Sequence, residues 1–292
     1  MDTHAGEEIF SQPNAWREAV ALHATVEKLL PRKGERVAFV GCGTSWFMSM
    51  AVASRREELG MGESDAFTAS EFPYHREYDR IVVISRSGTT TEVVSLLEQV
   101  KGRPTLSLTA VEESPVAALA ADAIILDFAD EKSVLQTRYA TAVLALMRTH
   151  FGEDMAQVTR DCEEMLAKPL DRELVEAEQI TFLGTGWTVG LAHEAALKTR
   201  ESAQFWAEAY PAMDYRHGPI SIAQPGRAVW LFGEPPAGLI ADIAATGATI
   251  EQSKVDPMAH LVLAQRVAVA ISQSRGLDTD NPRSLARSII LS

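Results

Sequence analysis

The sequence predicts an α/β protein built from two tandem units, each a parallel sheet flanked by helices. Two observations predict this class. Short apolar segments with the character of buried strands alternate with longer helical segments along most of the chain, which is the pattern of a parallel sheet covered by helices on both faces. The pattern then restarts, because Val37–Gly43 is repeated at Ile180–Gly186 with an offset of 143 residues. A constant offset indicates duplication of one α/β unit.

The first copy supplies most of the expected elements. Its predicted strands are Val37–Val40, Ile81–Ile84, Thr105–Leu108 and Ala123–Leu126, and its predicted helices are Trp46–Leu59, Thr91–Lys101 and Val116–Ala121. A helical bridge without strand signals follows over Tyr139–Phe151 and Glu153–Leu166. After the repeated strand, the second copy adds strand candidates at Ala228–Phe232 and Ala248–Gln252 and a helix at Leu261–Ser274.

These elements predict five successive regions. They are a helical N-terminal segment over 1–35, a first subdomain over 36–150, a helical linker over 151–178, a second subdomain over 179–275 and a C-terminal tail over 276–292. Each subdomain is long enough to bury a core of its own.

The segment Ser85–Glu92 directly follows the buried strand Ile81–Ile84 and contains five hydroxyl side chains and one glycine. A strand that ends in small hydroxyl residues and opens a helix suits a phosphate group. Backbone N–H groups, hydroxyls and the positive end of the helix dipole then converge on one anion. The alternative is simple capping of the helix by Ser or Thr, which needs one or two such residues. We therefore expect a phosphate-binding loop here.

A second hydroxyl-bearing turn, Gly43-Thr44-Ser45, is expected beside this loop. Gly41 and Gly43 resemble the start of a dinucleotide fingerprint, but Trp46 stands where its third glycine is required, so we reject dinucleotide binding. The second copy has Gly233–Pro236 in place of the hydroxyl loop, and its glutamate and prolines disfavour an anion. One phosphate site per chain is predicted.

The segment His193–Glu201 carries the second candidate cluster. On a helix, Glu194, Lys198 and Glu201 share one face. Such spacing usually makes an exposed ion-pair ladder, but the apolar neighbours here, from Trp187 to Phe205 and Trp206, predict a packed helix. A carboxylate beside a lysine in a partly buried cleft is suited to act as a base. His217, before Gly-Pro on a loop, is a candidate for moving a proton to a sugar oxygen, although most lone loop histidines are structural.

Composition limits the classes of partner. The chain has 292 residues, of which 46% are apolar and 23% charged, and its formal net charge is −13. That charge disfavours nucleic acid, because no basic surplus exists to neutralise a phosphate backbone. Cys42 and Cys162 are too few for a disulfide scaffold or a cysteine-rich metal site. No signal pattern or membrane-length apolar run occurs. We expect a cytoplasmic protein without metal or cofactor.

Taken together, the motifs resemble the SIS (sugar isomerase) family, in particular the isomerase half of glucosamine-6-phosphate synthases. The matching segments occur in the same order as in that family, and they are Gly41–Ser45, Ser85–Gly88, Glu194–Glu201, Ala207–Tyr210, Arg216–Pro219 and Asp280–Ser288. The resemblance implies two flavodoxin-like three-layer SIS subdomains, with the tail over the active site. Only one helix is expected before Arg36, so the glutaminase part of the synthase is expected to be absent.

The resemblance also implies roles for individual residues. The implied substrate-binding residues are Gly43, Thr44, Ser45, Ser85, Arg86, Ser87, Thr90, Val134, Gln136, Glu194 and Ala286. Arg86 stands where the synthase has glutamine and would add a charge-assisted contact. Glu201 matches the base for proton transfer between C1 and C2, assisted by Lys198. His217 matches the group that assists ring opening, contributed in that family by the neighbouring subunit of a dimer.

One departure from the family leaves the outcome open. Arg287 stands where the synthase has a lysine, and arginine neither shuttles protons nor forms an imine. Glu201 and His217 still suffice to open a ring and abstract the C2 proton. We therefore expect aldose–ketose isomerisation of a hexose 6-phosphate, with an amino sugar 6-phosphate as the first candidate, with or without deamination. The alternatives are a dehydratase that eliminates water and a non-catalytic sugar-phosphate regulator.

Overall fold

A computed structural model describes residues 3–291, which form two compact units that do not follow chain order. Among the described residues, the first-sheet unit contains residues 11–132, 136–155 and 286–291. The second-sheet unit contains residues 3–10, 133–135 and 156–285. Helix α1 (His4–Phe10) therefore belongs to the second-sheet unit, whereas α2 (Gln12–Val26) belongs to the first-sheet unit.

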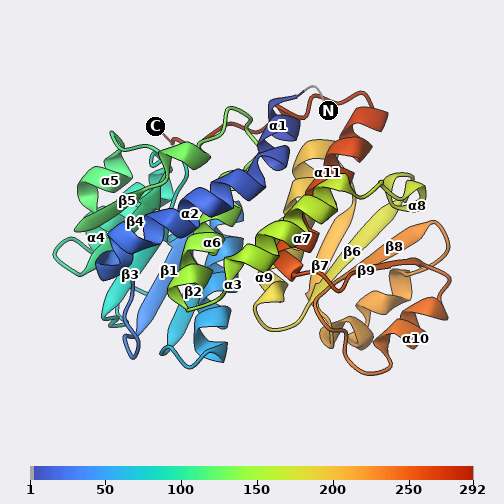
Figure 1. Ribbon diagram of the computed structural model, residues 1–292, viewed down its shortest axis with the longest axis horizontal. Helices are drawn as coiled ribbons and strands as arrows, with labels where there is room; N and C mark the ends of the chain where they lie inside the picture. The colour runs from blue at the N-terminus through green and yellow to red at the C-terminus, as the bar shows by residue number, and fades with distance from the viewer. Residues whose placement is uncertain (1–2, 292) are drawn as a thin grey trace. The chain divides into compact units, whose positions relative to one another are not determined.

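The first sheet has five parallel strands in the order β2-β1-β3-β4-β5 (Figure 1). Their bounds are β1 Val37–Gly41, β2 Ser64–Thr68, β3 Arg80–Ile84, β4 Thr105–Thr109 and β5 Asp122–Ile125. The four strands predicted for this copy are confirmed to within one residue at each end. Three of these strands, β1, β3 and β4, are buried along almost their whole length. For this reason β1 and β3 appear in the sequence as runs of apolar residues.

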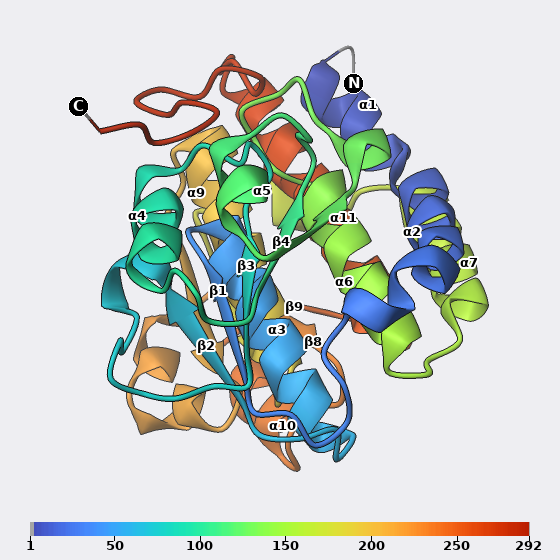
Figure 2. The ribbon, with the colours of Figure 1, turned by 90° about the vertical axis from the view of Figure 1, so that its left-hand side faces the viewer.

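Helices cover both faces of this sheet, as predicted (Figure 2). They are α3 (Thr44–Glu58), α4 (Thr91–Gln99), α5 (Pro115–Leu119) and α6 (Arg138–His150). The chain leaves β1 toward β2 on one side but leaves β3 toward β4 on the other. Right-handed crossovers in opposite directions put α3 on one face and α4 and α5 on the other. Helix α6 packs with α3 and with α2.

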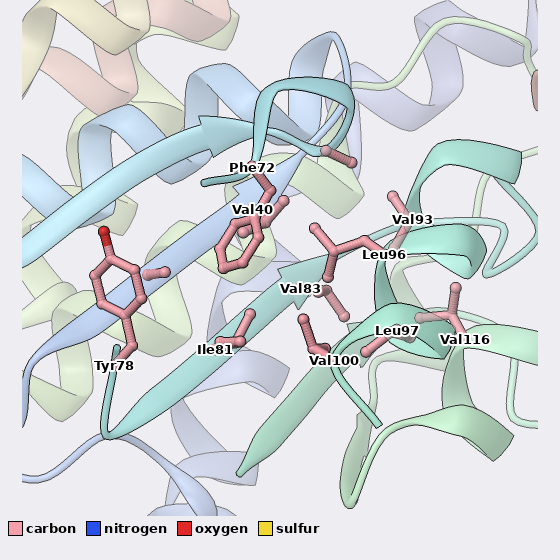
Figure 3. Packing of buried hydrophobic residues seen from close by; sticks show 12 residues of the cluster. Val40, Phe72, Tyr78, Ile81, Val83, Val93, Leu96, Leu97, Val100 and Val116 are labelled. Carbon is pink, nitrogen blue, oxygen red and sulfur yellow. The ribbon is translucent and has the colours of Figure 1, made fainter. Parts of the chain in front are cut away.

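Strand alternation supplies the apolar layer under α4 and α5 (Figure 3). Every second residue of β1 and β3 faces this layer, and Ile81 and Val83 are fully buried. From α4, Val93 contributes together with Leu96 and Leu97, three and four residues further on, and Val116 contributes from α5. This packing fixes where β3 ends and α4 begins, which is the stretch with the hydroxyl side chains.

The second sheet has four parallel strands in the order β7-β6-β8-β9. Their bounds are β6 Gln179–Gly184, β7 Ala207–Pro211, β8 Arg227–Phe232 and β9 Thr249–Gln252. The helices of this unit, besides α1, are α7 (Met155–Ala167), α8 (Arg172–Val175), α9 (Thr188–Ala203), α10 (Leu239–Ala244) and α11 (Pro257–Ser274). The order repeats the β2-β1-β3-β4 portion of the first sheet, so the duplication inferred from the offset is a duplication of topology.

Five short 3-10 helices complete the secondary structure within residues 3–291. They are Glu27–Leu29, Ala69–Glu71, Asp127–Ala129, Asp214–His217 and Pro219–Ile222. No helix in this stretch has the length and hydropathy that a membrane span requires.

Three features differ from the expectation. Two helices, α1 and α2, precede Arg36, where one was expected. The strands β2 and β7 were not predicted, and they occupy the same edge position in the two sheets. Both are half-exposed and lack an apolar run, so no strand pattern marks them. In addition, Phe205 and Trp206 do not belong to the helix of Glu194. Helix α9 ends at Ala203, and Trp206 is 48% exposed, so its expected burial is wrong.

Burial lowers the pKa of three histidines, His150, His193 and His260. The folded protein therefore binds fewer protons than the unfolded chain near their ordinary pKa of 6.5. The stability that these three neutral histidines contribute is fully present above pH 6.5. It is lost as the pH falls below 6.5 and through the lowered pKa values of the folded state. Lowering the pH from about 7.5 to about 5.5 will therefore reduce the thermal unfolding midpoint.

The contribution of His150 to this pH dependence can be measured separately. Its Nε2 lies 2.8 Å from the carbonyl oxygen of Pro31, and its Nδ1 lies 3.2 Å from Nε2 of His23. A His150→Gln variant will show a smaller drop in unfolding midpoint over this pH interval, whereas the exposed-site control His75→Gln will show the full drop. An equal drop in both variants would contradict the assignment.

Candidate functional site

The hydroxyl residues of the first-sheet unit converge at the point where the strand order reverses. The chain leaves β1 toward one edge of the sheet and leaves β3 toward the other, and the two strands are neighbours. In open α/β sheets, ligands bind outside the carboxyl ends of the strands at such a switch point. Thr44 and Ser45 follow β1, and Ser85–Thr90 follows β3, so both hydroxyl-bearing turns lie here. The sequence predicted this neighbourhood.

Backbone contacts hold the loop after β3 in place. Ser85 N–H donates to the carbonyl oxygen of Leu108 at 3.0 Å, and the buried Tyr139 hydroxyl donates to the same oxygen at 2.6 Å. Gly88 N–H donates to Ser85 O at 3.2 Å, and Val116 N–H donates to Gly88 O at 3.0 Å. These hydrogen bonds already hold the loop against neighbouring segments of the chain, so ligand binding costs little conformational entropy in the loop.

The hydroxyls of this loop do not cap α4. Thr90 is the N-cap residue, with extended backbone, and its side chain makes no capping hydrogen bond. Ser85 Oγ is buried and has no hydrogen-bond partner among the described residues. Ser87 Oγ accepts from the Thr89 hydroxyl at 3.1 Å. Capping, the alternative explanation for these residues, therefore does not account for Thr90 or Ser85.

Arg86 belongs to this loop, but its side chain is buried. That side chain is 0% exposed, and its Nη1 lies 3.5 Å from Oε2 of Glu131, whose side chain is equally buried. Arg86 Nη2 also donates to the carbonyl oxygen of Arg287 at 3.2 Å. The guanidinium expected to contact a phosphate is thus directed at protein groups in this structure.

Three charged residues of α9 form a compact cluster in the second-sheet unit. Lys198 Nζ lies 3.7 Å from Oε1 of Glu194 and donates a hydrogen bond to Oε2 of Glu201. The side chains of Glu194 and Lys198 are buried, whereas that of Glu201 is 21% exposed. The helical spacing predicted these contacts. Two carboxylates share one ammonium, and Glu201 is the carboxylate that solvent or a ligand reaches.

His217 occupies an exposed position at the end of a 3-10 helix in the same unit. No hydrogen bond or ion pair joins it to Glu201 or Lys198 in the described part of the chain. The contribution of His217 from a neighbouring subunit stays a prediction.

The remaining expected binding residues are spread over both units. Val134, in the second-sheet unit, donates its N–H to the carbonyl oxygen of Asp280 at 3.0 Å. Gln136, in the first-sheet unit, has a buried side-chain oxygen for which residues 3–291 provide no partner. Ala286 is exposed and begins the first-sheet part of the C-terminal tail.

The residues that follow the strands of the second sheet differ from those of the first-sheet loop. A cavity of about 610 Å³ is lined by Gly233–Pro235, after β8, and by Gln252–Pro257, after β9. Two carboxylates, Glu234 and Asp256, line it together with Lys254. This lining lacks the hydroxyl loop of the first sheet, as the sequence predicted.

Other groups near the candidate site limit its chemistry. Burial raises the pKa of the Cys42 thiol, so this group stays protonated beside the turn after β1. Among residues 3–291, no three His, Cys, Asp or Glu side chains gather in a way that would hold a metal ion. Sequence reasoning missed Glu131 as the partner of Arg86, because Asp130-Glu131-Lys132 has the pattern of an ordinary solvated charge run.

Comparison with known proteins identifies one domain directly. Residues 30–151 match the SIS domain family. The whole chain is similar to glutamine–fructose-6-phosphate aminotransferases (isomerizing). Identity is 28% to the protein of Sulfurisphaera tokodaii, over 97% of this chain and 55% of that protein. It is 29% to the protein of Gloeobacter violaceus, over 87% of this chain and 52% of that protein. The chain thus spans about half the length of these relatives.

Solved structures agree with the fold along nearly the whole chain. A glucosamine-6-phosphate deaminase from Thermotoga maritima superposes with a TM-score of 0.84 at 24% identity, over 99% of this chain and 100% of that one. A tagatose-6-phosphate ketose/aldose isomerase from Escherichia coli superposes with a TM-score of 0.79 at 22% identity, over 98% and 97% of the two chains. At these identities the likeness establishes the α/β fold with two parallel sheets.

Proposed function

Because the chain is a SIS-domain protein that resembles the isomerase part of the aminotransferases, we propose that it is a phosphosugar isomerase-type enzyme. Its proposed substrate is a hexose 6-phosphate, with amino sugar 6-phosphates as the first candidates. The observation that carries the proposal is the α9 cluster, in which Lys198 lies between two carboxylates and only Glu201 is accessible.

The phosphate group is proposed to bind at the switch point of the first sheet. Thr44, Ser45, Ser85, Ser87 and Thr90 supply hydroxyl groups, and the first turn of α4 supplies the positive end of a helix dipole. Two facts support this assignment. Thr90 makes no capping hydrogen bond, and Ser85 Oγ is buried without a partner in the described chain. Neither hydroxyl is thus used to cap α4, and Thr90 Oγ1 lies 3.5 Å from Ser288 Oγ.

The proposed chemistry follows from the charges of α9. Glu201 takes the proton from C2 of the open-chain sugar and returns it to C1, which converts an aldose to a ketose. Lys198 stabilises the negative charge that is shared between the carboxylate and the enediolate. His217 of a second copy assists ring opening, by resemblance. If the C2 substituent is an amine, the same proton transfer gives an imine at C2, and water then hydrolyses this imine to the ketose and ammonia.

Proton exchange is the experiment that tests this function. Protein in heavy water is incubated with glucosamine, N-acetylglucosamine, galactosamine and fructose 6-phosphates and followed by NMR. We expect deuterium to enter C1 or C2 of at least one sugar, with ammonia released if an amine leaves. A new alkene signal would instead support elimination of water. Binding without exchange for all four sugars would refute the enzyme and favour a regulator.

Ser85 tests the phosphate site with little risk to the fold. Since Ser85 Oγ has no partner among the described residues, Ser85→Ala will leave thermal stability nearly unchanged. It will raise the KM for the sugar phosphate about 10- to 100-fold, because a hydrogen bond to a charged group contributes about 1.5–3 kcal/mol. Ser107→Ala removes a buried hydroxyl of β4 that donates to Asp122 O, and it will leave KM unchanged. Equal KM values in both variants would contradict the site.

A further inference from the structure

Arg86 of the phosphate loop forms a buried ion pair with Glu131. Arg86 and Glu131 are both 0% exposed, with Nη1 and Oε2 3.5 Å apart. The other carboxylate oxygen, Oε1, accepts from Thr137 N–H at 2.6 Å and from Arg138 N–H at 2.9 Å, at the start of α6. Burying two charges is costly, and the hydrogen bonds to Oε1 offset part of that cost. The Arg86 guanidinium is directed at Glu131 and at the Arg287 carbonyl oxygen.

The same pair reaches the C-terminal end of the chain. Arg86 Nη2 donates to the carbonyl oxygen of Arg287 at 3.2 Å. In return, Arg287 donates from Nη1 to the carbonyl oxygen of Glu131 and forms an ion pair with Asp130. These reciprocal contacts join the chain after β3, the chain before α6 and the C-terminal stretch.

From Arg287 the chain continues along the phosphate loop and the first turn of α4. The Thr89 hydroxyl donates to Ser288 Oγ at 3.0 Å, and Thr91 N–H donates to Ile289 O at 3.1 Å. Leu291 N–H then donates to Thr91 Oγ1 at 2.9 Å. Leu291 itself is 63% exposed. Apolar burial contributes little, so polar contacts hold this segment.

We propose that Arg86 is a positioning residue, which acts on the substrate site by holding Arg287 and the segment 286–291 against the phosphate loop. The effect depends on the proposed function, because the loop matters to catalysis only if it binds the sugar phosphate. The inference differs from the expectation of a direct contact between Arg86 and phosphate. Direct contact requires the guanidinium to leave Glu131, which would strand a buried carboxylate.

A double-mutant cycle distinguishes positioning from direct contact. One arm is the neutral pair Arg86→Gln with Glu131→Gln, which avoids an unpaired buried charge and keeps an acceptor for the start of α6. The other arm is Arg287→Ala, and both arms are then combined. Arg283→Ala, at an exposed arginine of the same C-terminal stretch, is the matched control. Each variant is measured for glucosamine 6-phosphate affinity, inorganic phosphate affinity and thermal unfolding.

Positioning predicts non-additive results. Each arm will weaken glucosamine 6-phosphate binding about tenfold, the change expected for about one net hydrogen bond, and the combined variant will be no weaker than either arm. Additive losses, seen also with inorganic phosphate, would mean that Arg86 contacts phosphate directly and would overturn the proposal. A purely structural role would lower the unfolding midpoint without this pattern.

Amide hydrogen exchange decides the proposal independently of any substrate. The amides of Thr91 and Leu291 are donors between the segment and α4, so both arms will accelerate their exchange about tenfold, and the Arg283 control will not. Unchanged exchange in the neutral-pair variant would refute positioning. If the wild-type protein binds no sugar phosphate, the proposed function fails, while this measurement still tests the inference.

Discussion

Replacing Glu201 by glutamine will lower turnover by about 10²- to 10⁴-fold, the usual contribution of a general base. The change removes only the basic oxygen. Lys198 keeps its contact with Glu194 3.7 Å away, so the cluster retains one ion pair and the fold is expected to persist. Affinity for the sugar phosphate will change little, because the phosphate is proposed to bind at the loop after β3. Deuterium incorporation from heavy water measures the effect directly.

One control variant and one mixing experiment accompany the Glu201→Gln measurement. Glu98→Gln alters an exposed glutamate at the end of α4 and will leave turnover unchanged. Mixing Glu201→Gln with His217→Ala subunits tests the proposed dimer, because a site that takes its histidine from the neighbouring copy is restored in some mixed dimers. Full turnover by Glu201→Gln alone would refute the assignment of the base.

Replacing Gly88 by alanine will destabilise the protein by about 2–4 kcal/mol and weaken sugar-phosphate binding at least about tenfold. Gly88 has a φ of +65°, and a Cβ there would lie 2.2 Å from Ser114 Oγ and 2.4 Å from Ser114 Cβ. Ser114 is the N-cap of α5, so it has little freedom to move. The loop must shift instead, and the hydroxyls of Ser85 and Ser87 shift with it.

Gly102 is the matched control for this substitution. It also has a positive φ, +91°, but no heavy atom lies within 4 Å of a Cβ built there. Gly102→Ala therefore carries only the backbone cost of about 1–2 kcal/mol and leaves affinity unchanged. Thermal unfolding and calorimetric binding separate the two variants. A folded Gly88→Ala protein with wild-type affinity would contradict the role given to the loop.

The confirmed parts of the fold are those with a local signal. Buried strands such as β3 have uninterrupted apolar runs, and the repeat at a fixed offset indicated the second sheet. The edge strands β2 and β7 were missed because their side chains are only half-buried, which leaves no periodic pattern. The end of α9 was also misplaced. Gln204 adopts a left-handed conformation after it, which no glycine marks in the sequence.

The sequence by itself determined the fold class, the hydroxyl loop after β3 and the spacing of Glu194, Lys198 and Glu201. These are local properties, because a strand end or one face of a helix is encoded by consecutive residues. Only the tertiary structure decided which protein groups Arg86 contacts. Its partner Arg287 lies 201 residues away. Long-range pairing of this kind depends on where the topology brings chain segments together, and no local pattern records it.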